Sequence, residues 1–145
     1  MGSFWFRLVI GHLVGDYLLQ TNCMALNKKK QDTEGMQACC IHCLVYSLAV
    51  LLAVFPEISN MGSFVDAGLF AIVVFISHFI FDRWNIVDFW LELIGSRSYD
   101  KTLEKPVPEM NIKDHYAVAY TALVQTVADN TLHLIGLFVA VKIFM

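Results

Sequence analysis

Four long apolar segments are the feature that most limits what this chain can fold into. A helix needs about 20 apolar residues to cross the hydrocarbon core of a bilayer, because each residue advances it by about 1.5 Å. Segments of about that length lie at residues 4–24, 38–56, 64–83 and 117–143. We therefore predict an all-α, polytopic membrane protein, a four-transmembrane-helix bundle in which residues 1–145 form a single transmembrane domain.

The composition agrees with a location in lipid. Hydrophobic residues make up 57% of the 145 residues, charged residues make up 16%, and the mean hydropathy is +0.58. The net charge of -3 is small and spread along the chain, so nucleic acid is not expected as a partner. We expect contacts with membrane lipids, and association into a homo-oligomer stays open.

The positive charges of the connections indicate a topology. Residues 25–37 contain Lys28, Lys29 and Lys30, whereas the connection between the second and third segments has no Lys or Arg. The third connection, residues 84–114, carries Arg97, Lys101, Lys105 and Lys113. Because Lys and Arg gather on the cytoplasmic side, we predict that residues 25–37 and 84–114 are cytoplasmic and that both termini face the other side. Arg7 and Lys142 argue against this orientation.

The third connection begins with a helical pattern. In WNIVDFWLELIGSR, residues 84–97, large apolar residues recur at near-helical spacing with acidic residues between them. This pattern predicts a short helix lying in the membrane interface, and an ordinary amphipathic connector is an equal alternative. Residues 98–111, which contain Pro106 and Pro108, are predicted to form a loop.

Histidine and aspartate recur four residues apart inside three of the four segments. HLVGD contains His12 and Asp16, HFIFD contains His78 and Asp82, and DNTLH contains Asp129 and His133. Four residues advance a helix by about 400°, so each pair shares one helix face. The second segment adds His42. If the four segments span the membrane in the predicted orientation, each helix presents a histidine or aspartate in the cytoplasmic half of the membrane.

Seven ionisable groups inside a bilayer need a common partner. A central charged residue costs about 2.5 to 3.5 kcal/mol on insertion scales, so such groups normally face the bundle interior. Imidazole and carboxylate together suit a divalent metal, and we expect zinc, with manganese or iron as alternatives, as one or two ions. The metal ligands would come from this set: His12, Asp16, His42, His78, Asp82, Asp129 and His133. The alternative is a hydrogen-bonded His–Asp network that joins the helices without a metal.

The motifs resemble a family. HLVGDYLLQTNCMALNKKK, a lone histidine, HFIFDRW and QTVADNTLH follow one another as in an uncharacterised family of small four-helix membrane proteins from bacteria and phages, with HxxxD, HxxxDR and DxxxH motifs. The resemblance covers nearly the whole chain, although Asn85 and Asn130 replace the Lys and Gln expected there. It implies a location in the bacterial inner membrane, in a bacterial or phage-encoded protein. The family's repeated residues map to His12, Asp16, Gln20, Asn27, Lys28, His42, His78, Asp82, Arg83, Gln125, Asp129 and His133.

A more distant similarity, through helix-borne HxxxD ligands, is to membrane-bound metal-dependent hydrolases. It suggests hydrolysis of a phosphate ester or pyrophosphate at the cytoplasmic membrane surface, with an anionic, phosphate-containing substrate. The catalytic residues would be Asp16 or Asp82 as the base and Arg83 as a phosphate clamp, although Arg83 is equally explained as an interfacial anchor. Gln20 and Gln125 lie one turn from Asp16 and Asp129 and could orient these ligands, or simply join helices.

Other functions stay open beside the hydrolase. The same residues could bind a metal ion or relay protons in a transporter or channel subunit, or hold a structural metal in a non-catalytic membrane interaction protein. The run CCIHC at residues 39–43 could bind zinc or copper with His42. Cys39 and Cys40 point to different faces of a helix, so we interpret these cysteines as packing residues.

Overall fold

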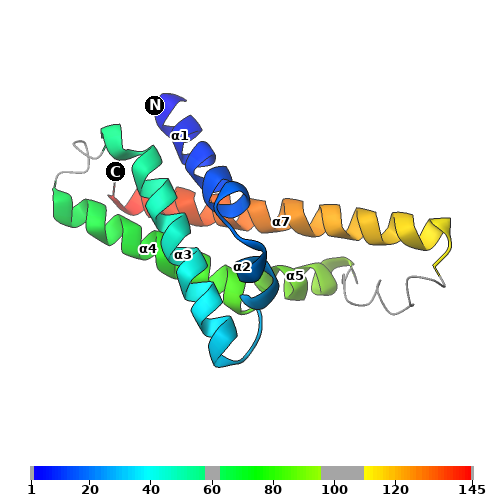
Figure 1. The fold of residues 1–145 in the computed structure, drawn as a ribbon. Coiled ribbons are helices and arrows are strands. Elements are labelled where there is room, and N and C mark those ends of the chain that lie inside the picture. Colours follow the sequence, from blue (N-terminus) through cyan, green and yellow to red (C-terminus); the bar gives the residue numbers. More distant parts are fainter. Residues whose placement is uncertain (1, 58–62, 96–109, 145) are drawn as a thin grey trace. The chain divides into compact units, whose positions relative to one another are not determined.

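The computed structural model describes residues 2–57, 63–95 and 110–144, and these residues form helices and no strand (Figure 1). The all-α prediction is therefore confirmed for this part of the chain. The predicted loop at residues 98–111 lies almost wholly outside the described residues, as do Arg97, Lys101 and Lys105. The helical elements are α1 (Gly2–Leu13), a π-helical segment (Val14–Leu18), α2 (Asn22–Asn27), α3 (Thr33–Ala53), α4 (Phe64–Arg83), α5 (Ile86–Gly95) and α7 (Ile112–Phe144).

The chain divides into two compact units, which we describe separately. The first unit comprises Met1–Trp84 and His133–Met145, and the second comprises Asn85–Leu132. α7 contributes its first part to the second unit and its last part to the first. The prediction that residues 1–145 make a single transmembrane domain stays a prediction.

Three helices, not four, are long and apolar enough to cross a membrane: α3, α4 and α7. The prediction of a fourth span at residues 4–24 is corrected, because the N-terminal helix ends near Leu18 and a new helix begins at Asn22. Its last turn is π-helical, and the Leu19 amide bonds to the carbonyl oxygen of Val14, five residues earlier, at 3.0 Å. The sequence shows no proline here, so the break could not be predicted from composition.

Side-chain caps explain where the helices begin. Thr21 Oγ1 accepts from the Met24 amide at 3.3 Å and starts α2. Asp32 Oδ1 accepts from the Gly35 amide at 2.7 Å before α3, and Ser63 Oγ accepts from the Asp66 amide at 3.2 Å before α4. Each cap satisfies an amide that has no partner within its helix, so these polar residues fix the start of the apolar segments.

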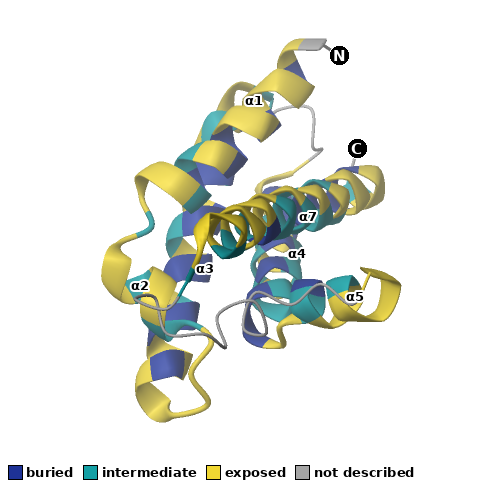
Figure 2. Ribbon diagram, turned by 90° about the vertical axis from the view of Figure 1, so that its right-hand side faces the viewer, coloured by how far each residue is buried: buried dark blue, intermediate teal, exposed yellow. Residues whose placement is uncertain are grey.

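Apolar residues from four helices form the core of the first unit, and Figure 2 shows buried residues along one side of α1 and α3 and exposed residues along the other. α1 contributes Phe4 and Leu8, and the other helices supply the remaining members. The full set is Phe4, Leu8, Tyr46, Val50, Val54, Ala67, Phe70, Val74, Leu137, Ala140 and Val141. Their burial holds the polar faces of the same helices together.

In the second unit, α5 confirms the predicted helix after the third apolar segment. Val87 is the buried residue of α5, and Gln125 of α7 donates a hydrogen bond to Asp88 Oδ1. This bond joins the two helices of the unit. The location of α5 in a membrane interface stays a prediction.

The π-helical segment and α3 approach each other closely at Gly15, which lies against Tyr46. A Cβ atom at residue 15 would lie 2.7 Å from Tyr46 Cδ2 and 3.1 Å from its Cα atom, which is too close for normal contact. Gly68 of α4 offers a matched site, because a Cβ atom there would meet nothing within 4 Å. Glycine at residue 15 therefore permits the packing that brings the polar residues of α1 and α3 together.

We predict that Gly15→Ala destabilises the protein by about 1–3 kcal/mol, because the added methyl group overfills this contact. Thermal denaturation in detergent micelles measures the effect. Gly68→Ala is the control and should be neutral or stabilising, since Ala favours a helix over Gly by about 1 kcal/mol. Equal melting temperatures of the two variants would contradict the close contact.

Candidate metal centre

Two of the predicted His–Asp pairs share a helix face in the first unit. His12 Nδ1 lies 3.3 Å from Asp16 Oδ2 on α1 and the π-helical segment, and His78 Nε2 lies 3.4 Å from Asp82 Oδ2 on α4. The π-helical turn keeps Asp16 beside His12 even though the helix is widened there. The i, i+4 spacing therefore aligns each pair as expected.

Four atoms from the π-helical segment, α3 and α4 converge on one point, which we call the His/Asp centre. His42 Nε2 and His78 Nε2 lie 2.9 Å apart. Asp16 Oδ1 lies 3.3 Å from both nitrogens, and Asp82 Oδ2 lies 3.2 Å from His42 Nε2 and 3.4 Å from His78 Nε2. Both histidines and Asp82 are buried, and the Asp16 side chain is 11% exposed.

The chemistry of these four atoms favours a cation between them. An ionised carboxylate only accepts hydrogen bonds, and a neutral imidazole nitrogen carries at most one hydrogen. A metal ion would instead receive a lone pair from all four atoms at once. Tetrahedral zinc, with ligands at about 2.0–2.1 Å, holds its ligand atoms about 3.3 Å apart. Asp16, His42 and His78 could therefore hold a metal ion.

Aromatic contacts hold the histidine rings in place. Tyr46 stacks on His78 with ring centroids 3.7 Å apart, and its hydroxyl group lies 3.0 Å from His12 Nδ1. His133, from the last part of α7, lies with its ring centroid 4.1 Å from that of His78. The Nδ1 atoms of His42 and His78 are buried and make no hydrogen bond to the described residues. Stacking thus replaces the usual outer hydrogen bond of a metal-binding histidine.

Lys28 brings a positive charge to the centre. Its Nζ atom donates to both oxygens of Asp82 at 2.9 Å, and its side chain is only 13% exposed. Gln20, which was predicted to orient Asp16, acts through its amide: the nitrogen donates to the Asp16 carbonyl oxygen and the oxygen accepts from Lys28 Nζ, each at 3.0 Å. Gln20 therefore joins the backbone at Asp16 to the cation that holds Asp82.

Arg83 fixes the segment that carries Lys28. Its Nη1 atom donates to the carbonyl oxygens of Lys28 and Lys30, and the residue is 5% exposed. In this conformation the guanidinium group holds the chain after α2 against the end of α4. The predicted role of Arg83 as a phosphate clamp stays a prediction.

The remaining predicted ligands are placed differently. His133 Nε2 lies 3.9 Å from Asp82 Oδ1, so His133 belongs to the surroundings of the centre. Asp129 lies four residues earlier on α7, in the second unit, as does Gln125, which bonds to Asp88. The first unit therefore assembles six of the seven predicted metal ligands: His12, Asp16, His42, His78, Asp82 and His133.

Sequence reasoning did not predict the contacts of two residues of this site. Lys28 to Lys30 were interpreted mainly as determinants of topology, with capture of an anionic headgroup as the alternative, and the bond from Lys28 to Asp82 was not predicted. Tyr46 lies four residues after His42, on the same face of α3, and this spacing could have identified it. Cys43 is also close: its sulfur and ligand atoms of His78 and Asp82 lie within 4.8 Å of one another.

We predict that the purified protein binds about one equivalent of a divalent transition metal through the His/Asp centre. His42→Ala and the double variant His78→Ala, Asp82→Ala should lose it, because each removes ligands. Elemental mass spectrometry of detergent-purified protein measures metal per chain. His115→Ala, at an exposed residue of α7, is the control and should keep the metal. Metal-free wild type after incubation with zinc would contradict this prediction.

The chain was compared with known proteins. None of the curated proteins and none of the solved structures in the comparison matches it significantly. A family model described as "Protein of unknown function (DUF3307)" matches residues 4–145, nearly the whole chain. The chain therefore belongs to the DUF3307 family.

Proposed function

We propose that this protein is a membrane-embedded, metal-dependent hydrolase that cleaves a phosphate ester or pyrophosphate at the cytoplasmic membrane surface. The observation that carries the proposal is the convergence of two carboxylate oxygens and two imidazole nitrogens. Each of these oxygens lies within 3.4 Å of both nitrogens. A nitrogen and oxygen ligand set of this kind suits zinc, and manganese or iron are the alternatives.

The place of the centre in its helices supports a site at a membrane surface. α3 and α4 are both long and apolar enough to cross a bilayer. Asp82 lies next to the last residue of α4, and Lys28 to Lys30 lie in the preceding connection between α2 and α3. The positive charges of that connection favour the cytoplasmic side, where a phosphate group in the aqueous phase could reach the centre.

One metal ion accounts for the contacts better than two. Each carboxylate has one oxygen at the centre and a second oxygen beside another group, as in sites where carboxylates bridge two ions. The second oxygen of Asp82 is bound by Lys28 at 2.9 Å, and His12 beside Asp16 is bound to Tyr46. Lys28 thus supplies a fixed positive charge where a second ion would otherwise lie.

The two carboxylates would have different roles. Asp82 is buried and held by Lys28, so it serves as a permanent ligand. Asp16 is the more exposed carboxylate and lies on the π-helical segment, so it would be the general base that accepts a proton from the attacking water. The metal, when bound, would promote ionisation of that water and polarise the phosphoryl oxygen. The ammonium group of Lys28 would stabilise charge on the phosphate.

The central test is metal-dependent turnover. Wild-type protein in detergent with zinc should hydrolyse at least one of p-nitrophenyl phosphate, bis(p-nitrophenyl) phosphate and pyrophosphate, and chelation should abolish the activity. Asp16→Asn should lower kcat by about 10²-fold or more, because the general base is lost. Glu34→Gln, at an exposed residue of α3, is the control. Metal-loaded wild type without turnover of any of the three substrates would exclude this proposal for those substrate classes.

A substitution at Lys28 tests catalysis separately from metal binding. Lys28→Met should keep the metal and lower kcat for the same substrate by about 10²-fold, the usual effect of removing one group that stabilises a transition state. Lys29→Met, at the exposed neighbouring residue, should retain wild-type kinetics. Loss of metal in Lys28→Met would instead assign Lys28 a structural role beside Asp82.

Transport is the second candidate, and a continuous set of buried titratable rings favours it. His12 contacts the Tyr46 hydroxyl group at 3.0 Å, Tyr46 stacks on His78, and His78 lies beside His133. Such a chain could relay protons through the bundle. Zinc or proton uptake by liposomes containing the protein, without hydrolysis, would support transport instead of catalysis.

A further inference from the structure

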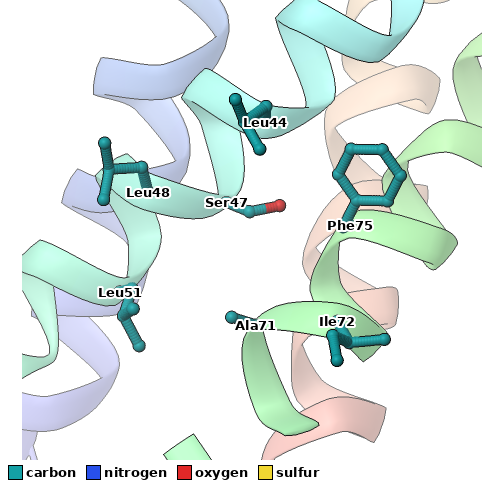
Figure 3. A pocket seen from close by; sticks show the side chains of 7 residues that line it. All are labelled: Leu44, Ser47, Leu48, Leu51, Ala71, Ile72 and Phe75. Carbon is teal, nitrogen blue, oxygen red and sulfur yellow. The ribbon is translucent and has the colours of Figure 1, made fainter. Parts of the chain in front are cut away.

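A hollow lies between α3 and α4. Its volume is about 400 Å³, and its walls are formed by Leu44, Ser47, Leu48, Leu51, Ala71, Ile72 and Phe75. Figure 3 shows the α3 residues and the α4 residues on opposite sides of this space. Leu48 and Ile72 are exposed, so the hollow opens to the surroundings of the helices.

The lining can accept only an apolar occupant. Six of the seven residues have hydrocarbon side chains. The exception, Ser47, donates its hydroxyl hydrogen to the Cys43 carbonyl oxygen at 2.7 Å and has no donor left for a ligand. Both walls belong to helices that are apolar enough to cross a membrane, so lipid tails would surround the opening.

The hollow leads along the two helices towards the His/Asp centre. Leu44 and Phe75 form its end near the centre, because Leu44 follows His42 by two residues and Phe75 precedes His78 by three. Leu51 and Ala71 lie at the other end, where Figure 3 shows them opposite each other. α3 runs away from the centre and α4 runs towards it, so the hollow extends from the level of Leu44 and Phe75 into the apolar part of both helices.

The size of the hollow favours a lipid chain over a protein helix. A helix with its side chains is about 10–12 Å wide, and a space of about 400 Å³ would accommodate about one turn of it. A single acyl chain is narrower and can follow the groove along its length. A lipid bound this way would have its headgroup at the end nearest His42, His78 and Lys28.

We propose that this hollow binds an acyl chain of a membrane lipid and that the lipid's phosphate headgroup reaches the His/Asp centre, so that the substrate is a lipid phosphate ester. The assignment rests on the proposed hydrolase function for the reaction, but not for the binding of the chain. Lys28 meets the phosphate at the centre while the hydrocarbon walls hold the tail. A membrane lipid thus matches the site at both ends.

The test fills the hollow and measures lipid and reaction separately. Ala71→Phe places a ring in the space from α4, and Leu48→Trp does so from α3 as a second variant. Val139→Phe is the control, because Val139 is an exposed residue of α7 that does not line the hollow. The proteins are reconstituted with dioleoyl phosphatidate, repurified in detergent, and analysed for lipid per chain, metal content, melting temperature and oligomeric state.

Both filled variants should retain about tenfold less phosphatidate than wild type, which corresponds to about 1.4 kcal/mol of lost binding. Val139→Phe should retain as much as wild type, and all variants should keep their metal. Hydrolysis of phosphatidate should fall in the filled variants, while hydrolysis of the soluble p-nitrophenyl phosphate persists.

Wild-type lipid retention in Ala71→Phe and Leu48→Trp would overturn the proposal, as would equal loss in Val139→Phe. Conversion of a dimer to a monomer without loss of lipid would also overturn it and identify the hollow as an interface between copies. If the filled variants lose lipid selectively but the wild type hydrolyses neither substrate, the chain-binding site is retained and the reaction is refuted.

Discussion

Two carboxylates and two imidazoles meet inside an apolar bundle, and most of the local structure depends on this meeting. Asp16 and Asp82 approach the same pair of histidine nitrogens at 3.2 to 3.4 Å. Buried charges are costly unless they are paired, and two negative groups at this separation repel each other. Lys28 offsets part of this charge, and a divalent cation at the centre would offset the rest.

The packing around the centre serves this convergence. Glycine at residue 15 lets α1 approach Tyr46, and Tyr46 in turn stacks on His78 and contacts His12. Arg83 holds the carbonyl groups after α2, so that the lysine in this segment lies over Asp82. The polar site and the apolar core therefore stabilise the same arrangement of helices, one through directional contacts and the other through burial.

The arrangement would join two chemistries that the proposed membrane-surface hydrolase needs. With a divalent cation bound at the His/Asp centre, the centre and Lys28 would present positive charge to an anion, while the hollow between α3 and α4 is lined by hydrocarbon. A phospholipid has the same two parts, a charged headgroup and a hydrocarbon tail. A site of this kind would select lipids by matching both parts, rather than by a large set of polar contacts.

The sequence by itself determined the helical class, three of the apolar helices and the residues from which the centre is built. The lengths of the apolar segments predict the helices. The four-residue spacing of histidine and aspartate predicts the ligands, because residues four apart on a helix share a face. α4 begins and ends where the apolar segment at residues 64–83 does, and α5 appears where its helical pattern predicted it. The family match at residues 4–145 agrees with the expectation that the chain belongs to an uncharacterised family.

Only the tertiary structure decided which helices place their polar faces together and where the first helix ends. Gly15 in the π-helical turn at Val14–Leu18 lies against Tyr46 of α3, and no local pattern in the sequence encodes this contact. The bond from Lys28 to Asp82 spans 54 residues. Long-range contacts of this kind arise from packing between helices, so the ligands could be named from the sequence while their partners could not.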